Sequence, residues 1–316
     1  MSDKAIDEIG SGLAANVPME LGEGRGAETP AAASPACAPG ALRAVLLIAG
    51  VTFREAARRK ILWIASLAGF AFLALFAVAL HAAIKSSVRM PLIARHEAMQ
   101  MMTMMVLYAG SMLTSLMAAL TSCDALAGEI ASGAIHAIAT KPVSRASIVL
   151  GKWAGFAGMI TLYVLLVEGG SLGIAAIEGG LVAAHSGAVL GLIWLEAILL
   201  LGVTLAASTT FSALTSGALS LGLYGLAFVG GWIEEFGAVR HVQTCVNLGI
   251  VSSLIMPSDA LWRRAAYLFQ PPLMGAAGVS PFATSSIPSY AMVIYAAFYA
   301  ALALILAQVL LVHRDL

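Results

Sequence analysis

The sequence predicts an all-α fold, a polytopic membrane bundle of six transmembrane helices with an N-terminal amphipathic helix and a cytosolic helix between two of the spans. Three observations support this prediction. Of the 316 residues, 60% are hydrophobic and only 11% are charged, whereas an ordinary soluble domain has about 25% charged residues. The apolar residues gather into runs of about twenty, which is the helix length that crosses a bilayer. The charged residues lie mostly between those runs.

Two segments precede the first span. Residues 1–40 are acidic and rich in glycine, proline and alanine, which predicts a disordered cytosolic tail. They lack the basic and then apolar start of a signal peptide. Residues 41–60 place apolar side chains at helical spacing and end in a run of basic residues. That pattern predicts an amphipathic helix in the membrane interface, at the start of a transmembrane domain over residues 41–316.

The transmembrane spans are expected at 61–80, 99–122, 153–177, 187–207, 211–233 and 290–312. Basic residues are more frequent on the side where the chain begins, and the cluster before the first span decides the orientation. Both termini are therefore expected in the cytosol, together with the loop 123–152. The segment 234–289 then faces outside.

Several functional classes have no support in the sequence. The net charge is zero, which gives no electrostatic case for a nucleic-acid partner. No GxxxxGK[ST] pattern occurs, so the chain is not expected to hydrolyse ATP or to be an enzyme by itself. The cysteines lack the spacing of metal ligands, and no metal site is expected. Methionines from Met99 to Met105 could bind Cu(I), but they wind all round a helix, which favours packing.

The loop 123–152 is the most informative polar segment, because it carries several of the few charges in the chain. It includes GEIASGAIHAIATKPVSRASIVLGKW, and the run TFREAARRK precedes the first span. Together these elements resemble the membrane subunits of type 2 ABC transporters, over about residues 42–316. The segment PSDALWR at 257–263 is similar to the branch that includes the copper-site-maturation permeases of denitrifying bacteria.

The resemblance implies an amphipathic elbow helix before the first span and a coupling helix in the loop 123–152 that docks on a separate ABC-type ATPase subunit. It also implies two ATPase copies per complex and a second permease subunit, as a homodimer or a heterodimer. ATP and Mg would be bound by the ATPase, with no cofactor on this chain. The expected location is the bacterial cytoplasmic (inner) membrane, with membrane lipid around the spans.

The residues that carry this coupling hypothesis share the loop or its borders. They are Asp124, Glu129, Gly133, Pro142, Arg145 and Lys152. Glu129 could present a carboxylate to a basic groove, and Pro142 fixes a turn. Arg145 offers a bidentate donor, and Lys152 can reach the headgroups where the next span begins. Anchoring by positive charge on the cytosolic side is the alternative for Lys141, Arg145 and Lys152. An ordinary solvated helix is the alternative for Glu129 and Gly133.

Two carboxylates lie inside predicted spans, Glu168 in the third and Glu196 in the fourth. Each needs a polar partner or a proton at that depth. They could line the substrate path or exchange protons, or each could be a neutral acid bonded to a serine or tyrosine of a neighbouring helix. In the fifth span Ser212, Ser216, Ser220 and Tyr224 form one helical stripe. We expect close helix packing there, with a polar lining of the pathway as the alternative.

In the outer segment, Pro257-Ser258-Asp259 predicts the start of a helix with Ser258 as its N-cap. Trp262 and the arginines that follow it suit a short helix at the level of the lipid headgroups. A lid over a translocation path is the alternative.

The function that these observations favour is the transmembrane subunit of an ABC transporter, an exporter of an unidentified substrate. The alternative is a six-span channel or ion-coupled carrier that works without an ATPase and uses Glu168 and Glu196.

Overall fold

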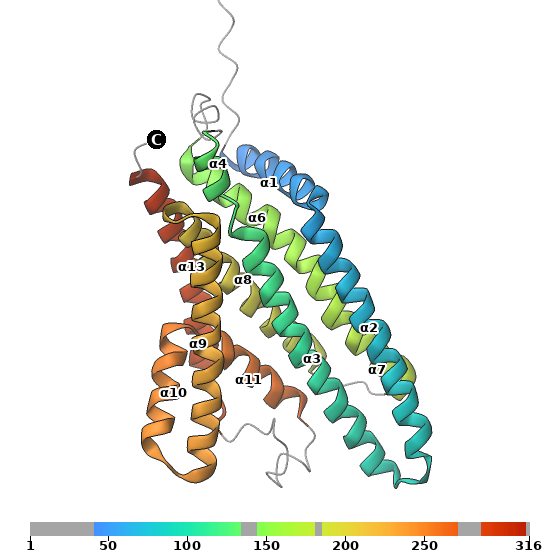
Figure 1. Cartoon of the computed structure of the whole chain (residues 1–316). Coiled ribbons are helices and arrows are strands. Elements are labelled where there is room, and N and C mark those ends of the chain that lie inside the picture. The colour runs from blue at the N-terminus through green and yellow to red at the C-terminus, as the bar shows by residue number, and fades with distance from the viewer. Residues whose placement is uncertain (1–40, 134–143, 181–184, 271–285, 314–316) are drawn as a thin grey trace, which may run out of the picture. The chain divides into compact units, whose positions relative to one another are not determined.

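Each apolar run of the sequence forms a long helix, and these helices lie side by side (Figure 1). The computed structural model describes residues 41–133, 144–180, 185–270 and 286–313. All of these residues belong to one compact unit, Pro39–Leu316. The long helices are α2 (Lys60–Ser86), α3 (Leu92–Ser122), α6 (Arg145–Val164), α8 (Ser186–Thr210), α9 (Ala213–Arg240) and α13 (Tyr290–His313).

The number of spans is confirmed. Within the described ranges, six helices are long and apolar enough to cross a membrane. In the third of them, α6 continues through a π-helical turn, η2 (Leu165–Gly169), into α7 (Gly170–Gly179). α6 begins at Arg145 and not near residue 153, because the Ser144 side chain accepts a hydrogen bond from the backbone N–H of Ser147 and caps the helix early. α3 likewise begins at Leu92 and not near residue 99, after a short 3-10 turn, η1 (Ser87–Arg89).

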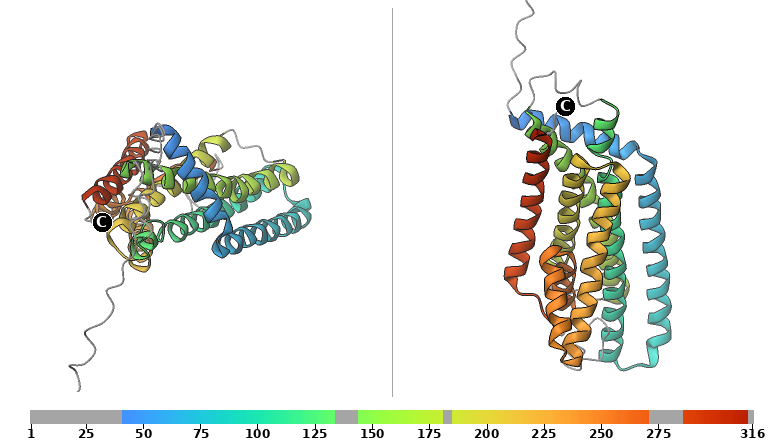
Figure 2. Two further views of the ribbon diagram at one scale, coloured as in Figure 1. Left: turned by 90° about the horizontal axis from the view of Figure 1, so that it is seen from above. Right: turned by 60° about the vertical axis from the view of Figure 1, so that its left-hand side comes forward.

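The predicted amphipathic helix is present as α1 (Ala41–Arg58), which lies across one end of the bundle (Figures 1 and 2). The chain becomes extended at Arg59 and turns into α2. α1 crosses α6 where glycines permit a close approach. A Cβ atom at Gly155 would lie 2.8 Å from the Ala49 carbonyl oxygen. Gly151 and Gly155 form a GxxxG pair, a spacing typical of close helix packing, and side chains at both would meet α1.

Two other GxxxG pairs in the sequence do not pack in this way. Gly169 and Gly173, and likewise Gly187 and Gly191, face open space: a Cβ atom at any of them would have no neighbour within 4 Å. The GxxxG spacing alone therefore does not produce helix packing at these two places within this chain.

α8 is the most buried of the six spans, and it packs against α3, α6, α9, α11 and α13. Its sequence is apolar all round, which is typical of a helix enclosed by others. α2 and α13 lie at the periphery, with few buried residues. The second view in Figure 2 shows the long helices running in one general direction, with α1 across one end. The helices around α8 place its polar residues in the interior of the bundle.

Between α9 and α13 the chain forms two further helices, α10 (Gln243–Ile255) and α11 (Ser258–Phe269), bent by 109° relative to each other. α10 runs back beside α9, and α11 packs on α8 (Figure 1). Two expectations are wrong here. The N-cap of α11 is Pro257 and not Ser258. Ser258 is the first residue of the helix, and its hydroxyl makes no capping hydrogen bond. Trp262 and Phe269 are buried in the core and do not form an exposed headgroup-level face, because α11 is enclosed by its neighbours.

Candidate functional site

A charged cluster lies at the end of the bundle that carries α1. It surrounds α4 (Ala127–Ala131), a short helix that follows α3 after one turn. Arg59, at the break between α1 and α2, donates hydrogen bonds to Asp124 Oδ2 (3.2 Å) and Glu55 Oε1 (3.0 Å). Burial lowers the pKa of Arg59, but the hydrogen bonds to both carboxylates outweigh it and the pKa is raised. The guanidinium is therefore a permanent positive link between α1 and the segment that leads to α4.

A second ion pair holds α4 to α6. Lys152 Nζ donates to Glu129 Oε1 (2.6 Å) and to the Ala125 carbonyl oxygen (2.8 Å). The Lys152 side chain is only 7% exposed and that of Glu129 24%. The Lys152 ammonium group therefore does not extend to the surface, and it binds the α4 segment instead. A polar cavity of about 250 Å³ lies between the two ion pairs, bordered by Thr52, Ser132 and Phe156 among others.

The remaining residues of the coupling hypothesis are distributed more widely. Gly133 follows α4 with a φ of 71°, a left-handed conformation that favours glycine. Arg145 donates to the carbonyl oxygens of Leu311 and Val312, both at 3.1 Å, near the C-terminal end of α13. A cation at that position also complements the helix dipole. Pro142 lies outside the described residues. The structure thus brings Asp124, Glu129 and Lys152 together, and places the Arg145 side chain, from the start of α6, against the end of α13.

Glu168 lies in the π-helical turn and is fully buried. Its carboxyl group packs against Gly110 of α3, where a side chain would overlap it. Neither carboxyl oxygen has a hydrogen-bond partner among the described residues. A buried carboxyl in such a site requires a proton to avoid the cost of an unpaired charge.

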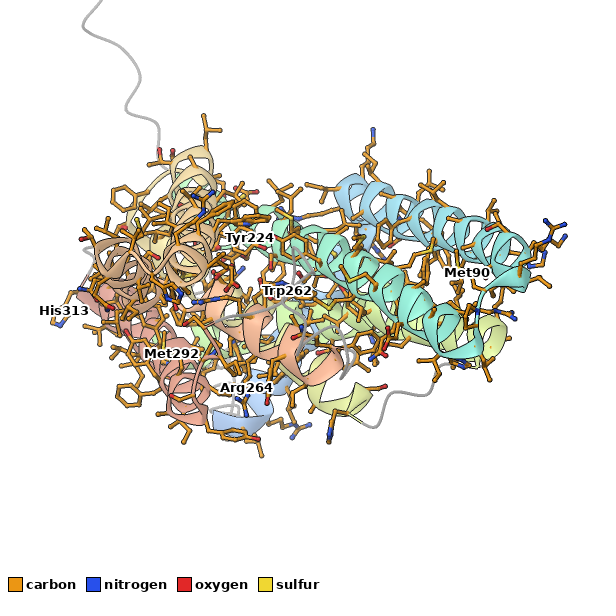
Figure 3. The ribbon with its side chains drawn as sticks, turned by 90° about the horizontal axis from the view of Figure 1, so that it is seen from below. Met90, Tyr224, Trp262, Arg264, Met292 and His313 are labelled. Atoms are coloured by element: carbon orange, nitrogen blue, oxygen red, sulfur yellow. The ribbon has the colours of Figure 1, made fainter. Side chains whose placement is uncertain are left out.

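Glu196 occupies the middle of α8 and is 1% exposed. The Ser115 hydroxyl of α3 donates to Glu196 Oε1 at 3.4 Å, and Tyr224 of α9 lies next to the carboxyl group. A serine and a tyrosine of neighbouring helices therefore surround Glu196, which is the arrangement expected if it is a bonded acid within the bundle. A small cavity beside Glu196 is also bordered by Ser258 and Trp262 of α11; Tyr224 and Trp262 are labelled in Figure 3.

A buried ion network joins α9 and α11. Arg263 Nη1 and Nη2 contact the two oxygens of Glu234, each at 2.8 Å, and Arg263 Nε lies 2.9 Å from Asp259 Oδ2. All three side chains are at most 8% exposed. The Ser286 hydroxyl donates to Glu234 Oε1 at 2.6 Å. Asp259 fits only because the facing residue of α9 is Gly231, where any side chain would overlap the carboxylate.

A comparison with family models matches residues 46–316 to the ABC-2 family transporter proteins. The match includes α2 to α13 and most of α1. This chain belongs to the ABC-2 transporter family. As an ABC-2 permease it is a transmembrane subunit of an ABC transporter, as the resemblance implied. A comparison with curated proteins gave no match.

The serine stripe of this ABC-2 permease serves its own helix. Ser212 is the N-cap of α9 and accepts from the backbone N–H of Thr215. Ser216 and Ser220 donate to the carbonyl oxygens of Ser212 and Ser216. Both are fully buried. Of the stripe, Tyr224 alone borders the small cavity beside Glu196.

The methionines of the ABC-2 permease point in different directions on α3. Met99 and Met104 are buried in two separate apolar clusters, and Met105 is 42% exposed. Over the described ranges, no group of three or more His, Cys, Asp or Glu side chains is arranged to hold a metal ion. The arrangement of the methionines is that of packing residues.

Sequence reasoning missed Glu234 and Asp259 as site residues and placed Arg263 at the membrane surface. The available signal was the occurrence of charges of both signs in two helices, with Glu234 in the last two turns of α9 and Asp259 and Arg263 within α11. In the ABC-2 permease these charges are enclosed, because Arg263 pairs with Glu234, 29 residues away, as well as with Asp259 of its own helix.

Proposed function

We propose that this ABC-2 permease couples ATP hydrolysis in a separate ATPase subunit to the export of a substrate, through the segment around α4. The observation that carries the proposal is the pair of ion pairs at the end of the bundle. Arg59–Asp124 and Lys152–Glu129 attach one short helix to both α1 and α6. A push on α4 from outside would therefore reach two long helices at once.

The geometry leaves one face of this segment available to a partner. Ala131 and Ser132, at the end of α4, are exposed, whereas Ala125 and Leu126 before it are buried. We infer that the exposed tip enters a groove of the ATPase while the ion pairs transmit the displacement. In this proposal Glu129 is a positioning residue held by Lys152, and the surface that docks is formed by the tip.

The distribution of basic residues gives the proposed orientation of the protein in the membrane. Arg263 and Arg264 are 6% and 7% exposed, so they no longer count as basic residues of the opposite surface. The basic residues near α1 and α4 are then a larger share of those at the two surfaces, which favours a cytosolic position for this end. Figure 1 shows that the beginning of α1 and the end of α13 lie at this end of the bundle. We propose a location in the bacterial inner membrane and a dimer of permeases with two ATPases, which bind ATP and Mg.

The test is co-purification of the neighbouring ATPase gene product with the tagged permease, in wild type and in Ala131→Arg. The substitution adds a bulky charge to the exposed tip without touching either ion pair, so we expect the ATPase to be lost from the complex while the permease remains monodisperse. Glu178→Arg, on the exposed surface of α7, is the matched control and should retain the ATPase. The proposal fails if no ATPase co-purifies with the wild type, or if Ala131→Arg retains as much as the control.

A further inference from the structure

The cavity beside Glu196 has the size and lining of a site for one water molecule. Its volume is about 10 Å³, and a cavity of roughly 10–15 Å³ measured in this way holds one water if two to four polar groups face it. Hydroxyl or carboxyl groups border it from four helices: Tyr108 and Ser111 of α3, Glu196 of α8, Tyr224 of α9, and the first two residues of α11. Several polar groups therefore border the cavity, within a wall that is otherwise mostly apolar.

Two buried atoms at this cavity lack partners. Glu196 Oε2 and Ser258 Oγ have no hydrogen-bond partner among the described residues. The two residues are 1% and 0% exposed. A buried polar atom without a partner costs about 1–3 kcal/mol, so each of them favours occupation of the cavity by a group that can both donate and accept.

The charges around the cavity do not balance. Arg263 is shared between Glu234, which occupies both of its terminal nitrogens, and Asp259, which contacts Nε. One guanidinium thus faces two carboxylates. Glu196 is subject to the field of Asp259, and its other close neighbours are the hydroxyls of Ser115 and Tyr224. Glu168 and Tyr108 are the further titratable groups that interact electrostatically with it. If Glu196 and Asp259 were both ionised at this depth, only Arg263 would be available as a counter-charge, and Arg263 is already shared with Glu234. That state would be strongly unfavourable.

We propose that Glu196 and Asp259 form an intramembrane proton-binding site, in which one proton is shared between the two carboxyl groups through a single water molecule. With the proton on Glu196 Oε2, the carboxyl donates to the water and the water donates to the Asp259 carboxylate. Ser258 Oγ donates to the same water. This assignment gives a partner to both orphaned atoms.

The proton can move without any other reactant. Glu196 gives its proton to the water as the water gives one of its own to Asp259, so one O–H bond breaks and one forms at each step. Asp259 then becomes neutral, and Arg263 keeps Glu234 as its counter-charge. Glu196 becomes the anion and faces the N-terminus of α11, where the first backbone N–H groups and the helix dipole favour a negative charge. Both positions of the proton are therefore supported by the structure.

In this proposal the contact between α8 and α11 depends on whether the site holds its proton. The inference goes beyond the proposed function and holds whether or not an ATPase binds α4. It concerns a different part of the molecule, since Glu196 lies in the middle of α8, whereas α4 lies at the end of the bundle that carries α1 (Figure 1).

The test is infrared difference spectroscopy of the purified full-length protein, cycled between low and high pH in water and in D₂O. The C=O stretch of a protonated carboxyl lies apart from the amide bands. We expect Glu196→Gln to lose one such band. Ser258→Ala and Asp259→Asn should each shift it, because the first removes a donor to the water and the second replaces the charged acceptor by a neutral amide. Glu168→Gln is the control: it removes a separate band that Ser258→Ala does not move.

Two results would overturn the proposal. An unchanged carboxyl region in Glu196→Gln would mean that Glu196 holds no proton. A band that is lost in Glu196→Gln but unmoved in Ser258→Ala and Asp259→Asn would mean that no water bridge joins the two groups. If Glu196→Gln does not fold, the comparison of Ser258→Ala with the wild type still decides, because the shift requires only the wild-type Glu196.

Discussion

Removal of Glu234 is expected to be among the most destabilising changes outside the apolar core. In Glu234→Ala, Arg263 loses the carboxylate that contacts both of its terminal nitrogens at 2.8 Å. Its side chain is 7% exposed, so water cannot replace the lost partner. Breaking a buried ion pair on one side costs about 3–5 kcal/mol. Ser286 also loses its acceptor, at 2.6 Å from Glu234, although its hydroxyl is only partly buried and can rehydrate.

The assay is the thermal midpoint of unfolding of the detergent-solubilised protein, followed by the loss of the monodisperse size-exclusion peak. At about 2–4 °C per kcal/mol for a large domain, the expected decrease is roughly 6–20 °C. Glu178→Ala is the matched control, because its pair with His81 is 31% and 58% exposed and an exposed pair contributes at most about 1 kcal/mol. If both variants lower the midpoint equally, the argument from desolvation is wrong.

Three further predictions concern the end of the bundle near α1 and can be checked by the same unfolding midpoint. Gly155→Val should prevent correct packing of α1, because its Cβ would lie 2.8 Å from a backbone oxygen, whereas Gly191→Ala, with open space around it, should be nearly neutral; equal effects would contradict the packing. Glu129→Ala should destabilise more than Lys152→Met, since the first leaves a buried ammonium and the second leaves a carboxylate that is 24% exposed; the reverse order would contradict this account of the ion pair. Ser144→Ala should cost about 0.5–2 kcal/mol through loss of the α6 cap, and no measurable change would show that the cap does not stabilise the helix.

The spans could be predicted because the apolar runs alone determine that they are helices. Their lengths could not. The sequence prediction places the segment from Arg145 to Lys152 in the loop before the third span, yet it is helical, because Ser144 caps it and both basic residues find partners at the bundle end. The local sequence carries no information about partners that are so distant along the chain.

The candidate site illustrates the same limit. The depth of Glu196 and its serine and tyrosine neighbours could be anticipated, since an acid in a span needs such groups. The cluster around Arg263 could not, because its charges are typical of a membrane surface when each helix is considered alone. Only the folding of α10 and α11 back onto the bundle brings Glu234 to Arg263.

The π-helical turn at Leu165–Gly169 changes the rotational phase of the third span. An α-helix advances about 100° per residue, and a π turn accommodates one extra residue. The faces of α6 and α7 are therefore offset by about 100° relative to one continuous helix. Deleting one residue within the turn would restore continuity and rotate either the α7 half or the α6 half out of its contacts. The third span thus consists of two helical halves whose packing faces point in different directions, and Glu168 lies in the turn between them.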